Sequence, residues 1–413
     1  MTISHIDLKL KINPVKQKLD ALAFLTIKDV GSEINLFLNE KLDWTVFKIE
    51  ENKKKIVLDF EVKDAPEDSF LRPVKIWQIK IPEEFVNEKE ILLECEYSGS
   101  IESDPWGTNY IREDAVELGC YVAYYPIENL EDKPTFSVVM RSPDDWTWVM
   151  NSDRLGDCKC NIWVTEEPRT DLYLIGLPNK SSMEFDEKKR FWGMKRNYDY
   201  YKSLESELNS MEQKLRRWLG ESKVTDFKIV LVPRDSGGLI AREGIIAMQD
   251  TISKEIIEKN KEQLLLSWVH EISHFWFNKT SPETFHNWVD EALCDFCSLM
   301  IGREMYGELF YDKKIKEIKN KIKSENLPPI KDLVRSNPKA ELTFYKYGSL
   351  IFHEILQKIG EEKLKNILHD FAQLSLKKDK IETDDFIDLI DTRTGISWKG
   401  FFDEKLSSNP EVE

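Results

Sequence analysis

Hydrophobic and polar residues alternate along the first part of the chain, in short runs separated by turn residues. From Ile6 onwards these runs include HIDLKLKINP, LAFLTIKD, INLFLNE, KIVLDFEVKD, WQIKIP and EILLECEYSG. Alternation with a period of two residues, over about five to eight positions, is typical of strands that bury one face. The pattern continues to about Asn179, so we expect an N-terminal antiparallel β-sandwich domain over residues 1–180.

After a polar run at residues 178–190, the pattern becomes mainly helical. Leucine or methionine at intervals of three or four residues predicts an amphipathic helix over residues 201–219. The apolar runs at residues 227–232 and 244–248 predict strands, and the second of these could hold an extended substrate by backbone hydrogen bonds. We therefore expect a second domain over residues 181–413, which is mostly helical in its C-terminal half.

A strongly apolar helix is predicted near residues 262–278, where hydrophobic residues occur on nearly every side. Further helices are predicted from near Tyr345 to Gly360 and around residues 364–371, and a last one is predicted to be capped by Thr383. A helix that is apolar nearly all round is expected to lie in the interior of a sizeable domain.

This apolar helix carries His270, Glu271 and His274 as an HExxH motif. Histidines at i and i+4 lie one turn apart on one helix face and can share one metal ion, for which zinc is the expected choice. Two histidines and a carboxylate, with a fourth position left to water, form the ligand set of a catalytic zinc site. Glu271 is placed to take a proton from that water and pass it to a leaving amine, which is the chemistry of peptide hydrolysis.

A chance occurrence of the motif is the alternative, because a chain with 6 histidines and 75 acidic residues can contain one by accident. The apolar surroundings argue against chance. Two histidines are costly to bury without a partner, and one metal ion is the partner that explains both.

Composition narrows the classes of function. The chain has 413 residues, of which 41% are hydrophobic, and this is typical of a soluble globular protein. A net charge of −16 argues against nucleic acid or an anionic membrane as partner. The first residues lack the pattern of a signal peptide and no apolar run is long enough to span a bilayer, so we expect a cytoplasmic protein.

The residues around the motif resemble the gluzincin aminopeptidase family, which includes membrane alanyl aminopeptidase and the leukotriene hydrolase. HEISHFWFN is similar to the family's HELxHQWFGN, and NWVDEALCDF is similar to its WLNEGFAxY. The resemblance implies a thermolysin-like zinc peptidase domain over residues 181–413, with one zinc ion per chain and Glu291 as its third ligand. Sixteen residues separate Glu291 from His274, two fewer than is usual in the family, and the shorter loop still allows the two helices to meet at the metal.

Other segments extend the resemblance beyond the zinc ligands. FYKYG at residues 344–348 is similar to the family's PYEKG, which implies that Tyr345 donates a hydrogen bond to the developing oxyanion. Without the resemblance, a core tyrosine would be the default interpretation. YPIENLEDKPTFSV and WVMNS are similar to segments of the family's β-domain.

The chain also departs from the family. The family's GAMENWG motif aligns with GLIAREG, which implies that Gly238, Leu239, Ile240 and Ala241 bind substrate. Ala241 stands where the family has the glutamate that holds the substrate's amino group, and Glu243 or a carboxylate from the β-domain could replace it. The large C-terminal helical domain of the family is expected to be absent, which would leave the cleft open or closed by a partner subunit.

Three side chains near Glu291 are of further interest. Asp295 lies four residues beyond Glu291 on the same helix face, where thermolysin-like enzymes place a carboxylate that orients the first zinc histidine. A surface or capping aspartate is the alternative. Cys294 and Cys297 form a CxxC pair that we expect to pack in the core, since a second such pair for a structural zinc site is lacking.

Together these observations predict a zinc metallopeptidase that acts on peptides, with aminopeptidase action as the family expectation. Two alternatives remain open. One is a zinc hydrolase with endopeptidase or non-peptide specificity, and the other is a non-catalytic binding protein that keeps the peptidase fold. The sequence does not indicate an oligomeric state.

Overall fold

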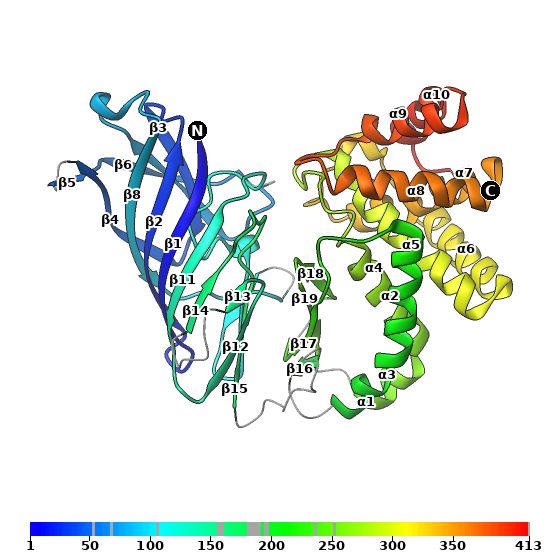
Figure 1. Ribbon diagram of the computed structural model, residues 1–413, viewed down its shortest axis with the longest axis horizontal. Coiled ribbons are helices and arrows are strands. Elements are labelled where there is room, and N and C mark those ends of the chain that lie inside the picture. Colours follow the sequence, from blue (N-terminus) through cyan, green and yellow to red (C-terminus); the bar gives the residue numbers. More distant parts are fainter. Residues whose placement is uncertain are drawn as a thin grey trace. The chain divides into compact units, whose positions relative to one another are not determined.

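The computed structural model describes residues 1–51, 54–66, 69–104, 107–154, 161–179, 191–193, 198–234, 238–250 and 253–411. The chain divides into two compact units, whose elements are labelled in Figure 1. The first unit contains Met1–Tyr198, Lys228–Gly238 and Arg242–Thr251, and the second contains Asp199–Phe227, Leu239–Ala241 and Ile252–Glu413. The structure is thus mixed β and helical, while the domain division at residue 180 stays a prediction.

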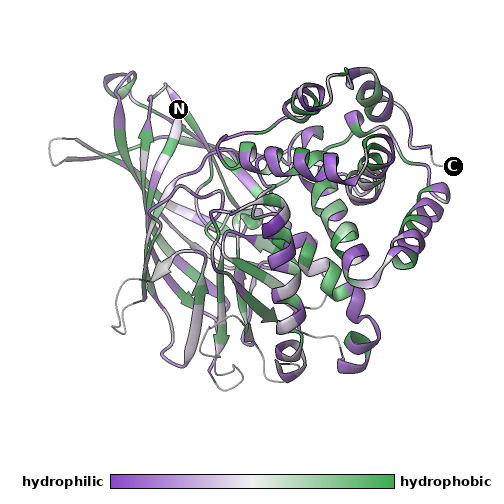
Figure 2. Ribbon diagram, turned by 45° about the vertical axis from the view of Figure 1, so that its right-hand side comes forward, coloured by the Kyte–Doolittle hydropathy of each residue, from purple (hydrophilic) through white to green (hydrophobic). Residues whose placement is uncertain are grey.

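The largest described sheet of the first unit has eight strands in the order β13-β14-β11-β1-β2-β8-β4-β5. Its strands are β1 (Thr2–Asn13), β2 (Lys18–Lys28), β4 (Leu42–Glu51), β5 (Lys54–Val57), β8 (Glu90–Gly99), β11 (Thr135–Arg141), β13 (Asp153–Arg154) and β14 (Asn161–Val164). Buried residues alternate with more exposed ones along most of β1 and β2, as a period of two predicts, and Figure 2 shows the corresponding alternation of hydropathy along the strands.

One pair in this sheet differs from the prediction of antiparallel strands. β1 and β11 run parallel, with Leu8 opposite Val138. Parallel neighbours need a long crossover connection, and the chain between Asn13 and Thr135 supplies one.

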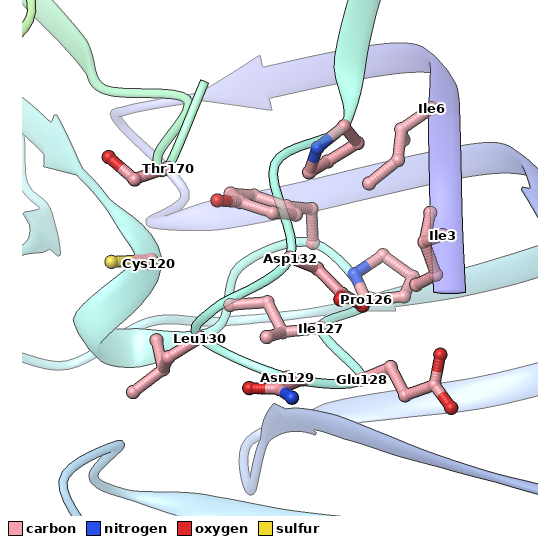
Figure 3. A pocket seen from close by; sticks show the side chains of 12 residues that line it. Ile3, Ile6, Cys120, Pro126, Ile127, Glu128, Asn129, Leu130, Asp132 and Thr170 are labelled. Atoms are coloured by element: carbon pink, nitrogen blue, oxygen red, sulfur yellow. The ribbon is translucent and has the colours of Figure 1, made fainter. Parts of the chain in front are cut away.

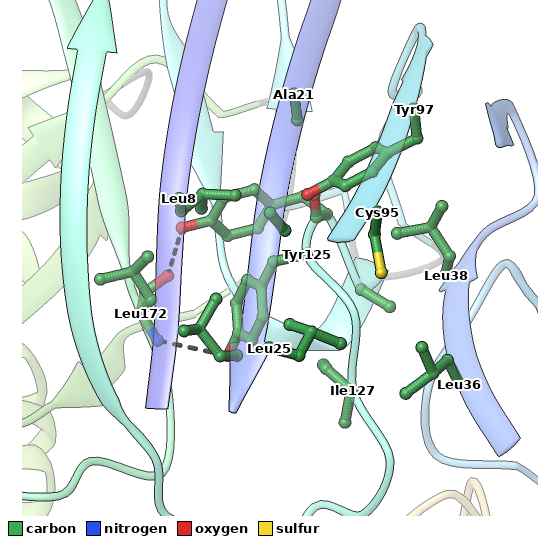
Figure 4. Close-up of a cluster of buried hydrophobic side chains, with 14 of the residues drawn as sticks. Leu8, Ala21, Leu25, Leu36, Leu38, Cys95, Tyr97, Tyr125, Ile127 and Leu172 are labelled. Atoms are coloured by element: carbon green, nitrogen blue, oxygen red, sulfur yellow. Dashed lines mark hydrogen bonds between the residues drawn. The ribbon is translucent and has the colours of Figure 1, made fainter. Parts of the chain in front are cut away.

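Two smaller sheets complete the β core of the first unit. One has the order β3-β7-β6 and the other the order β12-β15-β10-β9. Their strands are β3 (Glu33–Asn39), β6 (Phe60–Asp64), β7 (Val74–Lys80), β9 (Tyr110–Ile111), β10 (Val116–Leu118), β12 (Trp146–Met150) and β15 (Leu174–Pro178), and short 3-10 helices lie at Glu83–Phe85 and Cys120–Val122. Leucines from β1, β2 and β3 pack together in the core, where the Tyr125 hydroxyl accepts a hydrogen bond from the Leu172 backbone N–H (Figure 4).

A further sheet has the order β16-β17-β19-β18. It consists of β16 (Phe191–Gly193), β17 (Lys228–Val232), β18 (Ile240–Arg242) and β19 (Ile245–Gln249). The strands predicted at residues 227–232 and 244–248 are confirmed as β17 and β19, which pair in parallel. Both are apolar almost throughout, as expected of parallel strands that are covered on both faces.

The second unit is helical. Its helices are α1 (Tyr198–Ser203), α2 (Glu205–Leu219), α3 (Lys254–Lys259), α4 (Lys261–Ser273), α5 (Trp288–Tyr306), α6 (Glu308–Lys323), α7 (Gly348–Ile359), α8 (Glu361–Ser375), α9 (Thr383–Thr394) and α10 (Lys399–Ser407). A π-helix, η6, spans Glu341–Tyr347, and 3-10 helices lie at Phe285–Asn287 and Ile330–Asp332.

Several helix ends differ from the predicted ones. The helix predicted over residues 201–219 is split at Leu204, and α4 ends at Ser273 rather than at residue 278. The helix expected from Tyr345 begins as the π-helix and becomes α7 only at Gly348. Glu382 is the N-cap of α9 rather than Thr383, and Glu382 forms a reciprocal capping box with Asp385.

Helix α5 lies at the centre of the second unit and packs against α4, α6, α7 and η6. Every residue from its start to Gly302 is buried, yet Asp290, Glu291 and Asp295 are among them. Buried carboxylates are costly unless they have hydrogen-bond or ionic partners. The partners of these three side chains form the candidate site.

Candidate metal centre

Helix α4 presents His270 and His274 on one face, with ring centroids 4.9 Å apart. The helix proper ends at Ser273, but His274 keeps helical backbone angles as the C-cap residue. The next amides donate to carbonyls three residues back, so the chain tightens into a 3-10 turn just after the second histidine. The spacing of i and i+4 therefore survives although the predicted helix is shortened.

The loop that follows brings Glu291 to the two histidines. Asp290 accepts hydrogen bonds from the Thr280 backbone N–H at 2.9 Å and from its hydroxyl at 2.6 Å. The indole of Trp288 donates to the Thr383 hydroxyl at 3.0 Å, which fixes the start of α5. Although the loop is two residues shorter than is usual in the family, Glu291 Oε2 lies 3.4 Å from His270 Nε2 and 3.5 Å from His274 Nε2.

His270, His274 and Glu291 form a group that could hold a metal ion, with one ligand atom from each lying within 4.8 Å of the others. Within the described part of the chain, Glu291 Oε2 is buried and has no hydrogen-bond partner. A buried carboxylate oxygen that lacks a hydrogen-bond partner and lies between two imidazole nitrogens is a group that a bound cation would satisfy. The set of two nitrogens and one carboxylate oxygen suits zinc, so the residues fit the metal that the sequence predicts.

The charges of these groups depend on one another. Burial lowers the pKa of His270, but its hydrogen bond with Asp295 and the nearby Glu291 carboxylate raise that pKa to about 10. Burial raises the pKa of Glu291, but the charges of Arg335 and His274 outweigh it and hold the pKa well below its usual value. Without a metal the histidines therefore carry the positive charge that Glu291 needs.

Both histidines are oriented through their second ring nitrogen. His270 Nδ1 donates to Asp295 Oδ1 at 2.9 Å, and His274 Nδ1 donates to the Phe277 carbonyl at 2.9 Å. These bonds leave each Nε2 directed toward Glu291, which is the arrangement that metal-binding histidines use. Asp295 therefore lies where the sequence placed it, in contact with the first histidine.

A lysine that sequence reasoning missed completes this network. Lys346 Nζ lies 2.5 Å from Asp295 Oδ2. Burial raises the pKa of Asp295, but the Lys346 charge and the His270 hydrogen bond outweigh it, so the pKa is lowered. The available signal was the position of Lys346 beside Tyr345 in FYKYG.

Tyr345 reaches the site from η6. Its ring stacks on the His270 imidazole, with centroids 5.2 Å apart and planes inclined by 4°. Burial, together with the nearby Glu291 and Glu271 charges, raises the pKa of Tyr345 well above its usual value, although Arg335 opposes this. The phenol thus keeps its proton at neutral pH and can act as a hydrogen-bond donor.

A glycine lets η6 and α7 approach α5 closely. A Cβ atom at Gly348 would lie 2.6 Å from the Ala292 Cβ of α5, so only glycine lets α7 and η6 pack so tightly against the ligand helix. π-Helical turns are often found at functional sites, and here the turn directs Tyr345 toward the histidines.

Arg335 is the second residue that sequence reasoning missed. Its Nη2 lies 3.7 Å from Glu291 Oε1, and its Cζ lies 4.6 Å from the centroid of the Tyr345 ring. Arg335 precedes Tyr345 by ten positions in a segment without a periodic pattern, so no local signal indicated it.

Glu271 follows His270 on α4 and is half-buried. Its charge raises the pKa values of both His270 and His274, against the effect of their burial. This places the Glu271 carboxylate near both histidines, as a general base requires.

Of the predicted substrate-binding residues, Ile240 and Ala241 lie in β18, and Gly238 and Leu239 come just before it. Within the first unit, Arg234 Nη1 donates to the Gly238 carbonyl at 2.7 Å, and the Thr170 hydroxyl donates to Glu243 Oε1 at 3.0 Å. The roles of Gly238, Leu239, Ile240 and Ala241 in substrate binding stay predictions.

The cysteines of the CxxC pair are buried free thiols, and burial raises the pKa of both. Cys294 Sγ lies 3.3 Å from His274 Nδ1, on the side of the ring away from Glu291. Their predicted place in the core is confirmed. Cys158 and Cys160 lie outside the described residues.

A separate pocket in the first unit is apolar with two carboxylates (Figure 3). Ile3, Ile6, Pro126 and Ile127 line it together with Glu128 and Asp132. Burial raises the pKa of both carboxyls. It has no histidine, and His270, His274 and Glu291 form the one described group suited to a metal. Of the described helices, none combines the length and the apolar character needed to cross a membrane.

Comparison with solved structures gives the same picture of the fold. Over 100% of this chain and 95% of the other, the structure matches an M1 zinc metallopeptidase mutant from Deinococcus radiodurans, bound to a Tyr-Ser-Ala substrate, with a TM-score of 0.76 and 15% identity. Native yeast LTA4 hydrolase matches with a TM-score of 0.75 and 16% identity, over 100% of this chain and 69% of the other.

A third structure, a two-domain M1 zinc metallopeptidase mutant bound to L-tryptophan, matches with a TM-score of 0.74 and 15% identity, over 100% of this chain and 95% of the other. No protein-family model and no curated protein sequence matches the chain. The predicted resemblance to the gluzincin aminopeptidases is thus confirmed at the level of the fold.

Proposed function

We propose that the protein is a zinc-dependent metallopeptidase whose metal ligands are His270, His274 and Glu291. The observation that carries the proposal is the orphaned Glu291 Oε2 between two imidazole nitrogens. A scaffold has no use for such a site, because a largely buried cluster of two histidines and a carboxylate costs stability unless its groups are compensated. When bound, the zinc ion would polarise the scissile carbonyl and make water a stronger nucleophile near neutral pH.

The other residues have roles that follow from their positions. Glu271 would remove a proton from the attacking water and return it to the leaving amine, so that no acyl-enzyme forms. The Tyr345 phenol would donate a hydrogen bond to the carbonyl oxygen as it gains negative charge. Asp295 would hold His270 in the tautomer that keeps Nε2 free, which supports its predicted orienting role.

In this proposal the chain consists of two domains. Residues 1–180 form an N-terminal β-sandwich, and residues 181–413 form a thermolysin-like catalytic domain. The parallel strands and the helical character of the second part support this division. A cytoplasmic location stays a prediction.

Peptides are the proposed substrates, and the similarity of fold to the solved M1 zinc metallopeptidases favours an aminopeptidase-like action. The Deinococcus protein of similar fold was solved with a Tyr-Ser-Ala substrate, which supports peptides as the substrate class. Ala241 lacks the carboxylate with which the family anchors the substrate's amino group, so endopeptidase action is the second candidate. LTA4 hydrolase shares the fold, which keeps a non-peptide substrate as a further alternative.

The test compares the wild type with Glu271→Gln, both reconstituted with zinc. We expect each protein to bind one zinc ion per chain, and we expect the variant to cleave a mixed peptide library about 100-fold more slowly or not at all. Mass spectrometry of the products would separate single-residue removal from internal cleavage. A variant as active as the wild type would refute Glu271 as the base, and a zinc-loaded wild type that cleaves esters or epoxides but no peptide would favour a different hydrolase.

A further inference from the structure

The two carboxylate oxygens of Glu291 have different surroundings. Oε2 faces both histidines and is buried without a hydrogen-bond partner among the described residues. Oε1 faces the Arg335 guanidinium, whose Nη2 is 3.7 Å away. One oxygen of the Glu291 carboxylate therefore faces the candidate metal position, and the other faces the charged side chain of Arg335.

The same guanidinium contacts the predicted oxyanion donor. Arg335 Cζ lies 4.6 Å from the Tyr345 ring centroid, and the same ring also stacks on the His270 imidazole, which is nearly parallel to it. Stacking on a ring face is favourable for a cation and restricts how the ring can tilt. Arg335 thus touches a metal ligand and the tyrosine together.

We propose that Arg335 is a positioning residue of the metal centre, which engages one oxygen of Glu291 so that the other alone faces the metal. This inference rests on the proposed function. A carboxylate can bind a metal ion through one oxygen or through both. A second bound oxygen would take the position that a catalytic zinc site leaves to water, so engaging Oε1 keeps that position open.

The arginine side chain of Arg335 fits this role better than a lysine side chain would. A guanidinium is planar, always charged and able to stack on an aromatic ring while it donates hydrogen bonds at its edge. An ammonium group can supply the charge near Oε1 but cannot stack in the same way. The two contacts of Arg335 can therefore be separated by substitution.

The experiment uses Arg335→Met and Arg335→Lys in the full chain, each loaded with cobalt for spectroscopy and with zinc for kinetics. Arg335→Met is expected to change the visible absorption of the bound cobalt toward that of a higher coordination number and to lower kcat about 10- to 100-fold. Arg335→Lys is expected to keep the cobalt spectrum of the wild type but to lower kcat, because Tyr345 loses its stacking partner.

Arg303 provides a matched control. Its side chain is 24% exposed against 27% for Arg335, it pairs with Glu361 at 3.0 Å, and it lies over the Tyr311 ring at 5.4 Å. Arg303 also pairs with Glu308 at 2.6 Å, so Arg303→Met removes at least as many contacts as Arg335→Met, but away from the candidate ligands, and it should change neither the cobalt spectrum nor kcat.

The outcomes separate this inference from the proposed function. A wild type that binds no metal or hydrolyses nothing would reject the proposed function itself. A hydrolytic wild type together with an Arg335→Met variant that matches it in spectrum and kcat would overturn the role of Arg335 alone. Should Arg335→Met fail to fold, Arg335→Lys decides, because a wild-type kcat in that variant would overturn the positioning of Tyr345.

Discussion

At the scale of single residues, the site depends on how each buried carboxylate of α5 is compensated. Asp290 accepts hydrogen bonds from Thr280, and burial still raises its pKa. Glu291 and Asp295 each face a histidine and a cation instead. The first carboxylate therefore fixes the loop before α5, while the other two lie at the candidate metal centre.

The pair formed by Lys346 and Asp295 leads to a prediction about zinc affinity. Lys346 Nζ lies 2.5 Å from the oxygen of Asp295 that does not contact His270. Lys346→Met should weaken zinc binding about 10-fold, because groups that orient a ligand histidine typically contribute this much. Competition with a chelator of known affinity measures the change.

A double-mutant cycle shows whether Lys346 acts through Asp295. Lys346→Met should have little further effect in an Asp295→Asn background, since the carboxylate that it holds is then gone. Lys358→Met, an exposed lysine on α7, is the control. Equal losses from Lys346→Met in both backgrounds would show that the lysine acts by another route.

At the scale of elements, the contact between α5 and α7 positions Tyr345. A Cβ atom at Gly348 would lie 2.6 Å from that of Ala292. Gly348→Ala should lower the free energy of unfolding by about 1–3 kcal/mol, as overpacking does in well-packed cores. Chemical denaturation measures the loss, and hydrolysis should fall with it because η6 shifts.

Ala292→Gly offers the matched compensation. It costs about 1 kcal/mol by itself, because glycine is a poor helix former, but it removes the methyl group that meets the new side chain. The double variant should therefore lose less stability than the sum of the two single variants. If the stability loss of the double variant equals the sum of the losses of the two single variants, the side chains at positions 292 and 348 do not clash.

The large sheet of the first unit predicts an acid-sensitive contribution to stability. Glu94 on β8 accepts hydrogen bonds from Lys55 on β5 and Lys48 on β4. The hydrogen bond from Lys55 is the main cause that lowers the pKa of Glu94, burial opposes it, and Lys48 adds to the lowering. A carboxyl with a lowered folded pKa stabilises the fold above its unfolded pKa and loses this contribution as the pH falls.

Glu94→Gln should accordingly lower the free energy of unfolding at pH 7 by about 0.5–1 kcal/mol. The difference from the wild type should shrink as the pH falls through the folded pKa of Glu94. Denaturant titrations at several pH values measure it, with Glu90→Gln on the exposed start of the same strand as control. A difference that stays constant down to strongly acidic pH would contradict the assignment.

The strands and helices were predictable to different degrees. Alternation indicated β1 and β2 because their burial has a period of two, and continuous apolar runs indicated β17 and β19 because nearly every residue in them is buried. The parallel pairing of β1 with β11 was not predictable, since it depends on residues more than 120 positions apart. The π-helical turn before α7 was missed because its amino acids are compatible with an ordinary helix.

The residues of the candidate site were also predictable from the sequence only in part. His270 and His274 were found through their local spacing, and Asp295 through its position one turn beyond Glu291. Arg335 and Lys346 reach the site only through the packing of η6 on α5, which no sequence pattern records. Local spacing thus identified the two histidines and the family resemblance identified Glu291 as candidate ligands, while tertiary packing supplied the cations that surround them.

At the scale of the whole molecule, the fold matches M1 zinc metallopeptidases over the full described chain, at 14–16% identity. Each unit also contains its own buried ionic centre. In the first unit Arg234 and Glu117 pair at 2.5 Å with both side chains fully buried, and in the second unit His270, His274 and Glu291 bring three potential metal-binding atoms together. Of these two described centres, only the second offers two imidazole nitrogens and a carboxylate oxygen, the set of donors that suits zinc.

The most direct test of the central claim is a zinc titration of chelator-treated protein, followed by its rate of peptide hydrolysis. Activity should be lost with the metal and should return in proportion to added zinc, up to one ion per chain. The same titration of a Glu291→Ala variant should restore little activity at that ratio. Full activity in the zinc-free wild type, or normal restoration in Glu291→Ala, would contradict the account.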